Sequence, residues 1–136
     1  MAITSEQIAV HEVLDLHEFF EDWLSGRGPN SAEYFARLSR SLEHEFQIIT
    51  PAGILISRAS LIEGLAGGFA SCGAEFKLCV RNTQARMVGE GLCLVTYEEW
   101  QSKDGIEKGR LSSAFLRCTS QGPCTWVHVH ETALSE

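Results

Sequence analysis

The sequence predicts an α+β protein in which helices pack against one face of a curved antiparallel sheet. In the first third of the chain, apolar residues recur at helical spacing. Beyond Gly68, long strand-like stretches follow one another with short glycine-containing turns between them. Helices first and hairpin-linked strands afterwards is the order typical of α+β proteins. With 136 residues and 44% hydrophobic content, residues 1–136 are expected to form one domain with its own core.

The first element is predicted to be a long amphipathic helix over residues 5–25. Thr4 followed by Gln7 is the pattern of a capping box, and Gly26 is a suitable residue to end the helix. The apolar stripe that should face the core is Ala9, Val13, Leu16, Phe20 and Trp23.

Shorter elements are predicted next. A second helix should begin at Asn30 or Ser31 and run to about Leu42. A strand over 45–49 and a short returning strand over 54–56 should flank a turn at Pro51-Ala52-Gly53. Ser60 is expected to cap a third, short helix that ends near Leu65.

Four long strands are predicted over residues 75–89, 92–102, 108–119 and 125–134. The short turns between them favour antiparallel hairpins. Two of these strands carry apolar residues on both faces, as where Val95 and Tyr97 alternate with Leu94. The helices can cover only one face, so a homodimer through the other sheet face is predicted.

Charge and composition exclude several partners. The net charge of −7 and the pI near 5.2 disfavour nucleic acid and anionic membranes, which require basic surface. No apolar run approaches the roughly 20 residues of a membrane helix, and the first residues do not resemble a signal peptide. The expected location is therefore the cytoplasm.

The five cysteines are accordingly expected to be reduced, with a Cys118–Cys124 disulfide across a short turn as the one alternative.

Paired histidines near the end of the chain are the main candidate for chemistry. His128 and His130 alternate within the last predicted strand, so both project from the same face, together with Trp126 and Thr132. Their spacing from the nearby cysteines matches no zinc module. Neither a metal nor a cofactor is expected.

Several motifs resemble the nuclear-transport-factor-two-like superfamily, whose fold is also called cystatin-like or SnoaL-like. The stretches that carry the resemblance are 46–53, 95–101, 109–114 and 126–132, and they are most similar to an uncharacterised bacterial domain family within it. Residues 82–90 and 127–130 more distantly resemble the association (hub) domain of calcium/calmodulin-dependent kinase II. The resemblance implies a cone-shaped fold with a ligand pocket between sheet and helices. It does not identify an activity, because this fold hosts unrelated functions.

The resemblance also implies which residues line that pocket. They are Arg110, Ser112, His128, His130 and, by a weaker match, Glu98. Arg110 would hold a small organic or anionic ligand, and a histidine would donate a hydrogen bond or move a proton. A Glu98–His130 pair is the candidate catalytic couple.

Three interpretations of these residues stay open. Arg110 and Glu98 can form a purely structural pair, the pocket can bind a ligand without chemistry, or it can catalyse a lyase or isomerase reaction. Catalysis is disfavoured because the predicted sheet lacks the aspartate on which enzymes of this fold rely. The function predicted is small-molecule binding with an unknown ligand. The alternative is an oligomerising or regulatory association domain without catalysis.

Overall fold

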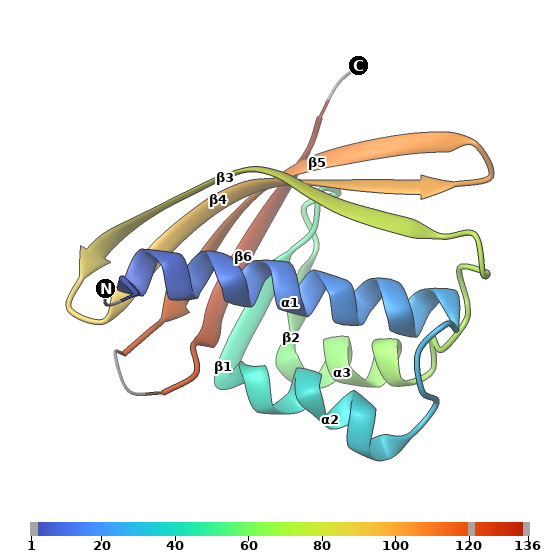
Figure 1. Cartoon of the computed structure of the whole chain (residues 1–136), viewed down its shortest axis with the longest axis horizontal. Coiled ribbons are helices and arrows are strands. Elements are labelled where there is room, and N and C mark those ends of the chain that lie inside the picture. Colours follow the sequence, from blue (N-terminus) through green and yellow to red (C-terminus); the bar gives the residue numbers. More distant parts are fainter. Residues whose placement is uncertain (1–2, 120–121, 135–136) are drawn as a thin grey trace.

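A computed structural model describes residues 3–119 and 122–134 and contains three helices and a six-stranded sheet (Figure 1). The helices are α1 (Ser5–Ser25), α2 (Ala32–Ser41) and α3 (Arg58–Ala66). The strands are β1 (Leu42–Ile49), β2 (Leu55–Ser57), β3 (Lys77–Gly89), β4 (Leu92–Lys103), β5 (Ile106–Arg117) and β6 (Thr125–Ala133). The predicted α+β class with a curved sheet around N-terminal helices is confirmed.

The sheet has the strand order β2-β1-β6-β5-β4-β3. Hairpins join β3 to β4, β4 to β5 and β1 to β2, so these pairs are antiparallel as predicted, and β5 and β6 are antiparallel too. The pair β1–β6 is parallel, which makes the sheet mixed. A long crossover separates these two strands in the sequence, so no hairpin fixes their relative direction.

Helix α1 lies across the concave face of the sheet, with α2 and α3 beside it (Figure 1). Thr4 and Gln7 form the predicted capping box, and Gly26 ends the helix with a φ of 79°. Val13, Leu16 and the other apolar side chains of the helix are buried against strands β3 and β4. One prediction shifts by a turn: Ser57 caps α3, not Ser60.

A β-bulge in β6 changes which residues face the core. On β5, Phe115 pairs with His128 and the next residue, Leu116, pairs with Trp126, so Val127 is the extra residue. Trp126, Val129 and Glu131 therefore share the concave face.

The other, convex sheet face carries no helix among the described residues (Figure 1). Leu111 is 45% exposed on it, and Leu94 and Phe115 are half-buried there.

Cys118 and Cys124 form a disulfide with a Cα–Cα distance of 4.4 Å. The expectation that all five cysteines are reduced is therefore wrong, because the two residues flank a connection short enough to bring their Cα atoms within bonding range. Cys72, Cys79 and Cys93 are free thiols.

Within residues 3–119 and 122–134 there is no helix with the length and hydropathy that a membrane span requires.

Candidate functional site

A cavity of about 230 Å³ lies between the concave face of the sheet and the three helices. Most of its wall is apolar and comes from all layers of the fold. Half-buried members of this wall include Phe20, Leu24, Ile48, Leu61 and Leu65. Because the wall is apolar, the few polar groups at one end determine what chemistry the cavity can support.

The first polar pair joins α1 to β4. His17 lies on the buried side of α1, and its Nδ1 is 2.7 Å from the carbonyl oxygen of Val13 in the preceding turn. Its Nε2 is 3.0 Å from Oε1 of Glu99. Both side chains are at most 8% exposed, so water screens this pair very little.

The second polar pair comes from β5 and β6. Arg110 donates through Nη1 to Oε1 of Glu131 at 3.1 Å, and its Nε lies 3.9 Å from Oε2 of Glu99. Gln101 donates to the same Oε2 of Glu99 at 2.6 Å. The result is a connected network in which one guanidinium lies between two carboxylates.

Burial and pairing set different protonation behaviour for the two carboxylates. Burial raises the pKa of Glu99, but the hydrogen bond and charge of His17, with help from Gln101 and Arg110, outweigh it, so the pKa is lowered overall. Burial also raises the pKa of Glu131, and there the charge of Arg110 does not compensate, so the pKa stays raised. The buried hydroxyl of Tyr97 has a pKa well above its usual value and stays protonated.

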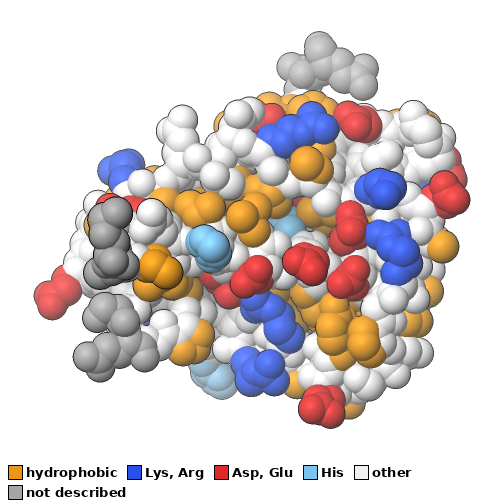
Figure 2. All heavy atoms as spheres, viewed as in Figure 1, with side chains coloured by type: hydrophobic (Ala, Val, Ile, Leu, Met, Phe, Trp, Pro, Cys, Tyr) orange, Lys and Arg blue, Asp and Glu red, His pale blue; other side chains and the backbone are white. Residues whose placement is uncertain are grey.

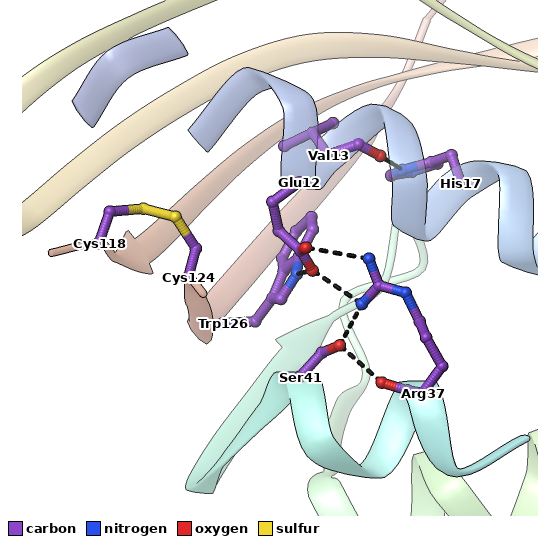
Figure 3. A network of polar contacts seen from close by, with 8 residues as sticks. All are labelled: Glu12, Val13, His17, Arg37, Ser41, Cys118, Cys124 and Trp126. Atoms are coloured by element: carbon purple, nitrogen blue, oxygen red, sulfur yellow. Dashed lines mark hydrogen bonds and ion pairs between the residues drawn. A yellow bond between two sulfur atoms is a disulfide. The ribbon is translucent and has the colours of Figure 1, made fainter. Parts of the chain in front are cut away.

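A separate network orients Trp126, which also lines the cavity (Figure 3). Its indole Nε1 donates to Oε2 of Glu12 at 2.8 Å. Arg37 on α2 holds the same carboxylate with two hydrogen bonds of 2.9 Å and also donates to Ser41. These contacts tie α1, α2 and β6 together, so partly buried polar bonds hold this part of the cavity wall in place.

Of the residues predicted to line the pocket, only Arg110 does so. Ser112 shares its strand face, as predicted, but is fully buried beside Tyr97, and its Oγ makes no hydrogen bond of normal geometry within the described residues. His128 and His130 do share one face, as predicted. The bulge at Val127 turns them to the convex face, which corrects their expected place in the cone.

Glu98 also lies on the convex face. It accepts hydrogen bonds from Asn82 and Trp100 and pairs with neither Arg110 nor His130. The proposed Arg110–Glu98 pair is therefore wrong, because these two side chains project from opposite faces of the sheet. The Glu98–His130 pair is wrong for another reason: both residues lie on the convex face, but Glu98 bonds to Asn82 and Trp100 instead. Glu99, one residue later, occupies the place beside Arg110.

Sequence reasoning missed His17, Glu99 and Glu131 as site residues. The signal for His17 was present: it follows Val13 by four residues and so continues the apolar stripe of the first helix. Glu99 continues the inward alternation of Val95 and Tyr97. Glu131 had no such signal, because its direction depends on the bulge.

A larger groove of about 670 Å³ lies on the outer surface between α1 and α2. Asp15, Glu18, Glu33 and Arg40 line it and are exposed to solvent. Figure 2 shows acidic and basic side chains mixed across this face. Such a groove is a solvated charged surface and lacks the mostly apolar wall of the cone cavity. Among the residues that the structure describes, no group of three or more His, Cys, Asp or Glu side chains is placed to hold a metal ion.

Solved structures similar to this one are nuclear-transport-factor-two-like proteins and kinase association domains. A protein of this kind of unknown function from Pseudomonas aeruginosa superposes with a TM-score of 0.85 at 22% identity, covering 94% of this chain and 99% of that one. The calcium/calmodulin-dependent kinase II hub of S. rosetta gives a TM-score of 0.74 at 10% identity, covering 98% and 100%. A nuclear-transport-factor-two-like protein from Cytophaga hutchinsonii gives 0.73 at 11% identity, covering 97% and 100%. These similarities confirm the expected nuclear-transport-factor-two-like fold.

Comparison with curated proteins finds no match. One family model, described as sucrose-6-phosphate phosphohydrolase C-terminal, matches residues 9–135. That match spans every element of the fold, from α1 to β6. The chain therefore belongs to the sucrose-6-phosphate phosphohydrolase C-terminal family.

Proposed function

We propose that this protein binds a small organic molecule in the cavity of the cone. The observation that carries the proposal is the placement of four ionisable side chains, His17, Glu99, Arg110 and Glu131, at one end of an otherwise apolar cavity. An apolar wall with a few convergent polar groups and shifted pKa values is the usual composition of a ligand site.

A purely structural role accounts for less of this arrangement. Burying ion pairs is costly compared with apolar packing, so a network of this size needs a reason beyond stability. Oε2 of Glu131 also accepts no hydrogen bond from the described residues, although the side chain is only 7% exposed. This oxygen is not among the fully buried atoms that lack a partner, so it is accessible to a ligand.

Cavity-filling variants test the proposal. Ile48 lies on the cavity side of β1, whereas Ile49, next to it and equally half-buried, lies on the convex side opposite His130. Ligand binding is measured as the rise in melting temperature against a panel of small alcohols, ketones and carboxylates. Ile48→Phe should weaken the binding of any hit at least tenfold, while Ile49→Phe should not. Equal effects of the two changes would contradict a ligand site in the cone.

The family description names a phosphohydrolase, and we infer that this cavity contributes binding and not phosphate-ester hydrolysis. Its volume of about 230 Å³ is below the usual range for drug-sized ligands, so a disaccharide phosphate would not fit. Its one arginine is already paired with Glu131, which leaves no cation for a phosphate.

Self-association is the second candidate function, and the convex sheet face favours it. Leu111 is exposed there, Leu94 and Phe115 are half-buried, and no helix of the described chain covers them. Among the similar folds are kinase hub and association domains. A second copy packed against this face would bury these side chains and form the predicted homodimer.

Light scattering tests the homodimer directly. We expect a dimer mass at micromolar concentration and expect Leu111→Glu to shift the protein towards monomer. Leu14→Glu is the matched control, because Leu14 is 43% exposed on α1, away from the convex face. A monomer mass for the unchanged protein would rule out the homodimer.

A further inference from the structure

The polar end of the cone cavity is balanced in charge. His17 Nδ1 must donate to the carbonyl of Val13, because a carbonyl oxygen can only accept. Nε2 therefore needs a proton between itself and Glu99 Oε1, 3.0 Å away. Whether the imidazole or the carboxyl carries that proton, the pair has no net charge.

The second pair is balanced in the same way. Arg110 is permanently cationic, and above the raised pKa of Glu131 an ionised carboxylate lies 3.1 Å from it. Tyr97 is the remaining ionisable residue of the cavity wall, and its hydroxyl is neutral. The wall as a whole therefore offers no unmatched charge to a ligand.

Hydrogen-bonding capacity remains on two neighbouring side chains, Glu131 and Arg110. Both oxygens of Glu99 accept bonds, from His17 and Gln101. In contrast, Oε2 of Glu131 accepts none from the described residues, and Arg110 uses one of its five N–H donors in a hydrogen bond. A ligand that enters this end of the cavity thus meets an acceptor on Glu131 and N–H donors on Arg110, but no unmatched charge.

We propose that the cavity selects an uncharged molecule that donates a hydroxyl hydrogen bond to Glu131 and places its carbon skeleton against Phe20, Ile48 and Leu61. This inference rests on the proposed binding function and deepens it. A carboxylate or phosphate would have to displace Glu131 from Arg110 or force a proton onto it. An ammonium group would bring an unmatched positive charge into an apolar cavity, where charges are costly to bury.

Matched probes that differ only in their polar group test this selectivity. Cyclohexanol, cyclohexanecarboxylate and cyclohexylamine share a six-carbon ring and are neutral, anionic and cationic at neutral pH. Affinities are measured by ligand-observed NMR and thermal-shift titration. Cyclohexanol should bind at least tenfold more tightly than either charged probe. Equal or tighter binding of a charged probe would overturn the inference but leave the proposed function standing, whereas no binding by any probe would overturn both.

A charge variant tests the cause of the selectivity. Glu131→Gln leaves Arg110 without its partner, so the ratio of carboxylate to alcohol affinity should rise at least tenfold. Glu98→Gln removes the same charge from the convex face of the sheet and should leave that ratio unchanged. An unchanged ratio in Glu131→Gln would overturn the inference. If that variant does not fold, the ranking of the three probes on the unchanged protein still decides it.

Discussion

His17 and Glu99, which lie 82 residues apart in the sequence, are joined by one shared proton in the core of the protein. The Val13 carbonyl fixes the imidazole so that Nε2 points at the carboxylate. The pair links the first helix to the fourth strand at a place where neither side chain is more than 8% exposed. It therefore combines a structural contact with a polar group of the cavity wall.

Removing one member of this pair should destabilise the protein strongly. In His17→Leu, Glu99 loses its main partner while it stays buried, and breaking a buried pair in this way costs about 3–5 kcal/mol. Urea unfolding gives the free energy of unfolding. The double variant His17→Leu, Glu99→Met should recover part of the loss, because no buried charge is then left unpaired. A cost below about 1 kcal/mol in the single variant would show that the pair is not formed.

The contribution of Glu131 to the stability of the folded protein should fall as the pH rises. Its pKa is raised in the folded state, so between the ordinary value of 4.5 and the higher folded value the folded protein binds more protons than the unfolded chain. The stabilisation from this carboxyl is complete below 4.5 and is lost as the pH rises through the folded pKa.

Comparison with Glu131→Gln isolates this effect. The stability of the unchanged protein relative to the variant should fall as the pH rises above 4.5. For Glu99, whose pKa is lowered, the sign is opposite: its contribution is present above 4.5 and is lost as the pH falls through the folded pKa. A stability difference between the unchanged protein and Glu131→Gln that is flat from pH 4 to 8 would contradict the raised pKa.

The sequence predicted the elements well because their signals are local. The capping box of Thr4 and Gln7, the glycine at position 26 and the turns between strands each act within a few residues. The face of His128 and His130 could not be predicted in this way. One extra residue, Val127, reverses every later side chain of the strand, and nothing in the alternating pattern marks that bulge.

The limit of local sequence patterns also explains why the partners of Arg110 were not predicted. Arg110 was identified through the resemblance and lies on a regular strand, whereas its partners depend on the pairing of three strands. Glu98 and Glu99 are chemically alike, and only the register decides which one faces the cavity. His17 comes from a helix and lies 82 residues before Glu99, so no local pattern in the sequence joins the two.

Reduction of the Cys118–Cys124 disulfide should lower the stability by about 2 kcal/mol, because the bond closes a short loop with a sequence separation of six. The melting temperature should fall in dithiothreitol, and Cys118→Ser, Cys124→Ser should melt at that lower temperature with or without reductant. Alkylation of the unfolded, unreduced protein followed by mass spectrometry should modify three cysteines, and five after reduction. Five modified cysteines before reduction would show that the disulfide is absent.

Gly109 should not tolerate a side chain, because the ring of Trp100 lies flat over it. A Cβ at position 109 would be 2.8 Å from three atoms of that ring. The ring cannot easily move, since its Nε1 donates to Glu98 at 2.9 Å and the guanidinium of Arg81 lies 5.1 Å from its centroid. Gly109→Ala should therefore cost about 1–3 kcal/mol and alter the tryptophan fluorescence.

The matched control is Gly64→Ala in the exposed part of α3, where a Cβ meets nothing within 4 Å. There the change should stabilise the protein by about 0.5–1 kcal/mol, because alanine restricts the unfolded chain and favours the helix. Chemical unfolding of the two variants beside the unchanged protein measures both effects. If Gly109→Ala were as stable as Gly64→Ala, the stacking of Trp100 on the glycine would be refuted, and with it the account of how this end of the convex face is packed.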